Sequence, residues 1–162
     1  MKKINVTVVC AGNHAYPGCA ELLADCPEVN LVAQPGGLNE AGIWVALGRS
    51  DVLVLDEAVM EQAGHQAIRS LHEYFPTIRS LMVVEGEHEY KTLAAVSLGV
   101  QGVIGRASTV SMLRKAIIAL YSGEAWLSRG LAQPLRNQLN QESELTCWTE
   151  LSADLAGRGR LN

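Results

Sequence analysis

The sequence predicts an α/β fold in which five parallel strands form one doubly wound sheet. Short apolar runs of Val, Ile and Leu alternate five times with segments whose apolar residues recur at helical spacing. The runs show no alternation of apolar and polar residues, which is typical of strands that helices cover on both faces. Strict alternation of strand and helix favours parallel strands joined by crossover helices.

The composition predicts one globular domain. The chain has 162 residues, of which 48% are apolar, so it is long enough to bury a sizeable core. A net charge of −4 leaves no basic face, and we do not expect this chain alone to bind DNA. It shows no signal peptide and no apolar run of membrane-spanning length, so we expect a cytoplasmic protein without membrane contact. The cysteines match no metal-binding spacing and are expected to be free thiols: Cys10, Cys19, Cys26 and Cys147.

The first half of the chain supplies two strand–helix units and a third strand. A β-branched run predicts a strand at residues 4–9, followed by a helix at 17–24. A second strand is expected at 29–33, and a second helix at 39–47 with Gly48 as its C-cap signal. The apolar run at 52–55 predicts the third strand, and Asp56 follows it directly.

The second half continues the alternation. Apolar residues at helical spacing predict a helix at 62–74, which Pro76 ends. A strand at 81–84, a helix at 88–98 and a strand at 100–104 follow. The last helix of the alternation carries an apolar stripe and ends near Gly123; the stripe is Val110, Leu113, Ile117 and Leu120. Together these elements predict a flavodoxin-like (βα)5 sheet.

Beyond Gly123 the pattern changes. Leucines at every fourth position predict an added C-terminal helix at 126–140, although Pro134 lies inside it. A polar linker at 141–144 and a short helix at 145–155 are expected after it. We therefore divide the chain into a domain at 1–124, the additional helix at 125–141, and residues 142–162.

Several stretches of this sequence resemble the receiver domain of NarL/LuxR-type bacterial response regulators. They are Asp-Val-Leu-Val-Leu-Asp at 51–56, Gly64, Tyr-Phe-Pro at 74–76, Leu-Gly-Val-Gln-Gly at 98–102 and Tyr-Ser-Gly-Glu-Ala-Trp-Leu-Ser at 121–128. The resemblance implies a receiver of a transcription regulator in two-component signal transduction, and not an enzyme. In that family a helix-turn-helix domain usually follows, so residues 142–162 are expected to be a linker, the start of that domain, or a tail. DNA would be bound only through such a domain.

The resemblance also assigns the positions of a receiver site, and most of them are altered. Asp56 matches the phosphoacceptor. The acidic pair that binds magnesium is replaced by Cys10 and Ala11, which are not hard oxygen ligands. Val84 stands where the family has a hydroxyl. The family's aromatic switch residue and its conserved lysine match Val103 and Arg106.

These replacements predict an atypical receiver that dimerises with a second copy and works without aspartyl phosphorylation. We expect no cofactor, no magnesium and no catalytic residue, because phosphoryl transfer to a carboxylate requires a divalent cation. On this interpretation Asp56 pairs with Arg106. A phosphorylatable receiver at Asp56, with Glu57 and Glu85 as substitute oxygen ligands, is the alternative.

Two further features carry possible functions. Residues 126–129 resemble a motif of VpsT/CsgD-type regulators that binds cyclic di-GMP and couples it to dimerisation; they are Trp126, Leu127, Ser128 and Arg129. The alternative is that Trp126 packs against the domain and Ser128 caps a helix. Cys10 is either a redox-sensitive thiol or an inert filler. Four histidines without ligand spacing are expected to be exposed: His14, His65, His72 and His88.

Overall fold

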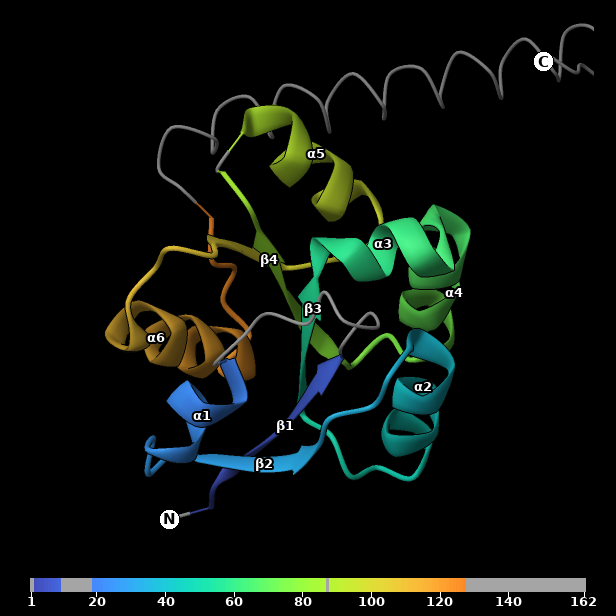
Figure 1. The fold of residues 1–162 in the computed structure, drawn as a ribbon. Coiled ribbons are helices and arrows are strands. Elements are labelled where there is room, and N and C mark those ends of the chain that lie inside the picture. The colour runs from blue at the N-terminus through green and yellow to red at the C-terminus, as the bar shows by residue number, and fades with distance from the viewer. Residues whose placement is uncertain (1, 10–18, 87, 128–162) are drawn as a thin grey trace, which may run out of the picture. The chain divides into compact units, whose positions relative to one another are not determined.

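The computed structural model describes residues 2–9, 19–86 and 88–127. A five-stranded parallel sheet with the order β2-β1-β3-β4-β5 forms its centre (Figure 1). The strands are β1 (Ile4–Val9), β2 (Val29–Ala33), β3 (Val52–Asp56), β4 (Arg79–Val84) and β5 (Gly102–Gly105). The chain passes from β1 to β2 on one side and then to β3, β4 and β5 on the other. The doubly wound, flavodoxin-like fold predicted from the sequence is therefore confirmed.

Helices cover both faces of this sheet. Those within the described ranges are α1 (Cys19–Ala24), α2 (Leu38–Ala46), α3 (Glu57–Ala63), α4 (His65–Tyr74), α5 (Glu89–Ser97) and α6 (Val110–Tyr121). Figure 1 shows α1 and α6 on one face, and α2 to α5 on the other. Such placement on both faces follows from the right-handed crossovers that parallel strands require.

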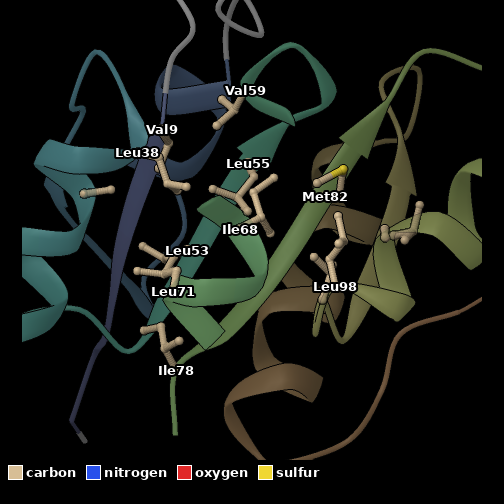
Figure 2. Packing of buried hydrophobic residues seen from close by; sticks show 14 of the residues in the cluster. Val9, Leu38, Leu53, Leu55, Val59, Ile68, Leu71, Ile78, Met82 and Leu98 are labelled. Atoms are coloured by element: carbon tan, nitrogen blue, oxygen red, sulfur yellow. The ribbon is translucent and has the colours of Figure 1, made fainter. Parts of the chain in front are cut away.

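Successive residues of each inner strand point into two different cores. Leu53 and Leu55 of β3 join Met82 of β4 in the core beneath α2 to α5. Val52 and Val54 enter the core beneath α1 and α6 instead. Figure 2 shows the first core, where side chains of the sheet meet those of the helices. Because both faces are buried, the strands carry no polar alternation.

Most elements lie where the sequence predicts them, but the segment after β3 differs. One helix was expected at 62–74, whereas the structure has α3 and α4. Asp56 starts α3 as its N-cap, and its side chain accepts a hydrogen bond from the Ala58 N–H at 3.0 Å. Gly64 separates the two helices with a φ of +87°, a conformation that favours glycine. The prediction of a single helix was wrong because this cap and this break were overlooked.

The segment after α6 covers the open edge of β5. The Trp126 N–H donates to the Gln101 carbonyl at 3.1 Å, and the Val103 N–H donates to the Trp126 carbonyl at 3.0 Å. Trp126 thus forms a parallel bridge with Gly102. The predicted helix at 126–140 is wrong for Trp126 and Leu127, which are not helical. The rest of that helix, the linker and the final segment lie outside the described residues.

Candidate functional site

Asp56 lies at the carboxyl end of β3, with its side chain only 2% exposed. Parallel α/β sheets place their functional groups at this edge because the loops that follow the strands converge there. Asp56 Oδ1 accepts the hydrogen bond from Ala58 that starts α3. The position of the carboxylate is thus fixed by the first turn of α3, the helix that Asp56 caps.

Arg106 follows β5 and reaches across to Asp56. Arg106 Nη2 lies 3.0 Å from Asp56 Oδ1 and 2.7 Å from Oδ2. Arg106 Nη1 donates to Glu85 Oε2 at 3.2 Å. The guanidinium therefore joins a buried carboxylate to an exposed one, since the Glu85 side chain is 75% exposed. The structure thus brings together Asp56 and Arg106, the two positions to which the resemblance assigns the phosphoacceptor and the lysine of the receiver site.

A second set of contacts surrounds this pair. Lys91 Nζ, from α5, lies 3.0 Å from Glu57 Oε2 and donates to the Glu85 carbonyl at 2.7 Å. Glu57 Oε1 accepts from the Glu85 N–H at 2.9 Å. These contacts link the start of α3, the end of β4 and the start of α5. Lys91 was missed at the sequence level, and the available signal was its place in the first turn of α5, the helix that follows a strand ending at the site.

The other predicted positions add no polar group to the described part of the site. Val84 is the last residue of β4 and is 1% exposed, and Val103 lies in β5 and is 9% exposed. Both belong to the core beneath α2 to α5. Cys10 and Ala11 lie outside the described residues. Within the ranges that the structure describes, no group of three or more His, Cys, Asp or Glu side chains is arranged to hold a metal ion.

Of residues 126–129, the structure describes only the first two. Trp126 packs against the core beneath α1 and α6, and Leu127 against the core beneath α2 to α5. The structure thus places Trp126 against the domain. Ser128 and Arg129 lie outside the described residues, so their contacts with any nucleotide stay a prediction.

One of the histidines was predicted wrongly. His72 is partly buried on α4, with Nδ1 2.9 Å from the Ile68 carbonyl oxygen and Nε2 2.6 Å from Ser80 Oγ. Burial lowers the pKa of His72 below its ordinary value of 6.5, against the opposing effect of hydrogen bonds to two carbonyl groups. His65 and His88 are exposed as expected, and His14 lies outside the described residues.

Two cavities of the described residues lie away from Asp56. A cavity of about 410 Å³ is lined by residues that include Ser50, Asp51 and Arg79, at the amino ends of β3 and β4. A cavity of about 270 Å³ lies between α2 and α4. Neither of these two cavities is lined by Asp56 or Arg106.

Other expectations concern thiols and membranes. Cys26 is buried and forms no disulfide, and burial raises the pKa of its thiol. Cys10 and Cys147 lie outside the described residues. In the part of the chain that the structure describes, no helix is long and apolar enough to cross a membrane.

The chain is similar to several characterised proteins, although no protein-family model matches it. It is 27% identical over 127 residues to the DNA-binding transcriptional activator DevR/DosR of Mycobacterium tuberculosis, which covers 78% of this chain. It spans only 58% of the length of that relative.

Solved structures show the same fold. A two-component response regulator of the LuxR family from Aurantimonas matches with a TM-score of 0.70 and 21% identity, over 85% of this chain and 98% of that one. The signal receiver domain of the response regulator NarL from Mycobacterium tuberculosis matches with a TM-score of 0.67 and 21% identity, over 76% of this chain and 100% of that one. At these identities the structural likeness establishes the fold.

Proposed function

Because the chain is a response-regulator receiver domain of the NarL/LuxR type, we propose that it is an atypical one that signals by dimerisation, without phosphorylation of Asp56. The relative DevR/DosR is a DNA-binding transcriptional activator. We propose a cytoplasmic homodimer that controls transcription through a helix-turn-helix domain of the kind that usually follows the receiver in NarL/LuxR-type regulators. The chain itself has no catalytic role in this proposal.

The observation that carries this proposal is the pairing of Asp56 with Arg106. Phosphorylation requires a carboxylate oxygen that is free to attack a phosphorus atom. Both oxygens of Asp56 accept hydrogen bonds from Arg106 Nη2, and Oδ1 also accepts one from Ala58. A phosphoryl donor would first have to displace a guanidinium that shares a buried contact with the carboxylate.

The residues present do not fit the magnesium ion that receivers of this family use. Magnesium needs hard oxygen ligands in near-octahedral geometry. Cys10 and Ala11 offer no carboxylate. The carboxylates of Glu57 and Glu85 already pair with Lys91 and Arg106, respectively. This arrangement favours a site in which arginine supplies the positive charge permanently.

The test compares the chain with a variant in which the receiver positions are restored. The restored variant carries Cys10→Asp, Ala11→Asp, Val84→Thr and Arg106→Lys. Both proteins are titrated with magnesium and beryllofluoride, a phosphoryl mimic, and sedimentation velocity reports their oligomeric state. We expect the natural chain to dimerise without either addition, and only the restored variant to bind the mimic.

Asp56→Asn is the matched control, because it keeps the shape of the side chain and removes its charge. Its dimerisation should equal that of the natural chain. If acetyl phosphate and magnesium add a phosphoryl group to the natural chain but not to Asp56→Asn, as judged by intact mass, the chain is a phosphorylatable receiver and the proposal fails.

We make a second proposal, for cyclic di-GMP binding, from the residues at 126–129. An arginine can stack on guanine and pair with phosphate, which supports the resemblance to the VpsT-type motif. Calorimetric titration of cyclic di-GMP tests it, with Arg129→Ala as the variant and Arg49→Ala, an exposed arginine of the domain, as control. Binding that only Arg129→Ala abolishes would support this input, and absence of binding by the natural chain would remove it.

A further inference from the structure

Residues 124–127, which we call the edge strap, lie along the edge of β5 and form an isolated parallel bridge with it at Trp126. Trp126 makes two backbone hydrogen bonds that attach the edge strap, one with Val103 of β5 and one with Gln101, the residue before β5. The side chains of Trp126 and Leu127 pack against opposite cores of the sheet. Gly123 precedes the edge strap with a φ of +91°, and the residues from Tyr121 to Ala125 are exposed. A short element held in this way can detach without unfolding the sheet.

Gln101 connects the edge strap to the start of β4. Its carbonyl accepts from the Trp126 N–H, and its side-chain Oε1 accepts from the Ser80 N–H at 2.8 Å. Its Nε2 donates to the Ile78 carbonyl at 3.4 Å. One residue therefore holds the edge strap through its main chain and β4 through its side chain.

Ser80 extends this connection to His72. The Nδ1 of neutral His72 carries the hydrogen that the Ile68 carbonyl accepts, so Nε2 accepts from the Ser80 hydroxyl. Ser80 is fully buried, and its hydroxyl lies 3.4 Å from Gln101 Oε1. Protonation of His72 would turn Nε2 into a donor, and the Ser80 hydrogen would have to turn towards Gln101.

His72 also packs directly against the turn that precedes Gln101, so a movement of His72 would displace this turn. A Cβ built on Gly99 would lie 2.8 Å from His72 Cβ, so the backbone of the turn before Gln101 rests directly against the histidine. The groups that face His72 are the carbonyls of Ile68 and Leu98 and the hydroxyl of Ser80, all uncharged. The charged residues of α4 itself, Arg69 and Glu73, are exposed.

We propose that protonation of His72 and release of the edge strap are linked through Gln101. Water stabilises a charged His72, and outward movement of the turn from Gly99 to Gln101, whose backbone rests against the histidine, would increase the contact of His72 with water. That movement withdraws the carbonyl that holds Trp126. By linkage, a chain with the edge strap released binds a proton at His72 more tightly, and acid favours release of the edge strap.

Amide hydrogen exchange of the full chain, followed by NMR at about pH 7.5 and about pH 5.5 and corrected for intrinsic rates, tests the first direction. The protection of the Val103 and Trp126 amides should fall about tenfold for each pKa unit that separates the attached and released states. In His72→Gln this pH dependence should disappear, and in His65→Gln, an exposed control, it should persist. Equal pH dependence in the chain and in His72→Gln would overturn the proposal.

Titration of His72 by NMR tests the reverse direction. Trp126→Ala should move the pKa of His72 upward towards its ordinary value, whereas Tyr90→Ala, an exposed aromatic control on α5, should not. Gln101→Met, which keeps the length of the side chain but not its hydrogen bonds, provides a second variant if Trp126→Ala does not fold. An unchanged His72 titration in a folded variant of Trp126 or Gln101 would refute the link. Neither measurement involves Asp56. The proposed link between His72 and the edge strap can therefore be refuted without affecting the function proposed above, and the reverse also holds.

Discussion

Lys91 of α5 pairs with Glu57 of α3 at 3.0 Å, and so ties together two helices that begin beside Asp56. The two side chains are 22% and 24% exposed, so solvent screens this pair only in part. The same ammonium group also donates to the Glu85 carbonyl. The start of α5 is therefore held in place by charge, close to the ion pair between Asp56 and Arg106.

Replacing Lys91 by Met should destabilise the domain by about 1 kcal/mol, because a partly buried ion pair and a charge-assisted hydrogen bond are lost. Urea denaturation measures the free energy of unfolding. Lys115→Met, on the exposed surface of α6, is the control and should change it by less than about 0.5 kcal/mol. Equal effects of the two substitutions would show that the Lys91 contacts contribute nothing measurable.

The pairing of Asp56 and Arg106 should appear as non-additivity. Asp56→Ala removes the α3 cap and leaves the guanidinium without its buried partner, so we expect a loss of about 2–4 kcal/mol. The double variant with Arg106→Ala should be less destabilised than the sum of the single variants, with a coupling free energy of about 1–3 kcal/mol. Additivity within about 0.5 kcal/mol would mean that the two side chains act separately.

The stability of the domain should decrease in mild acid because of His72. Its pKa is lowered in the folded state by burial, so the unfolded chain takes up a proton at a higher pH. The contribution of neutral His72 is therefore complete above the ordinary pKa of 6.5 and is lost as the pH falls through the folded pKa. Thermal unfolding as a function of pH measures this loss. His72→Gln should flatten the curve in this range, and a curve of unchanged shape would assign the loss to other groups.

Two glycines with positive φ provide a matched comparison. Gly99 has a φ of +101°, and a Cβ there would meet His72 at 2.8 Å, whereas Gly48 has a φ of +67° and open space around it. Gly48→Ala should cost about 1 kcal/mol from backbone strain alone. Gly99→Ala should cost at least about 1 kcal/mol more, because His72 must move as well. If chemical denaturation gives similar losses of unfolding free energy for the two variants, His72 can move away from residue 99 at little cost.

The sequence predicts the strands well because each is a continuous apolar run. The ends of β1 and β2 agree with prediction, while β4 begins earlier than expected, at Arg79. The helices after β3 were predicted less well, because Asp56 was considered as a phosphoacceptor and not as a cap. A residue can fill both positions, since a carboxylate at the end of a strand also precedes the next helix.

Only some of the residues of the site could be predicted from the sequence. The resemblance to receivers brings Asp56 and Arg106 into one site, and the structure places them in contact. The contacts of Lys91 and the burial of His72 depend on where α5 and α4 lie against the sheet. Such contacts between distant segments leave no periodic pattern in the sequence. A polar side chain is therefore predicted to be exposed unless its partner is known.

The edge strap has a practical consequence for anyone who shortens this protein. Without the backbone groups of Trp126, the outer side of β5 would present unpaired N–H and carbonyl groups to solvent. Exposed strand edges of this kind attract other chains and promote aggregation. A chain shortened to end at Gly123, just after α6, should therefore aggregate more readily than one that ends at Leu127.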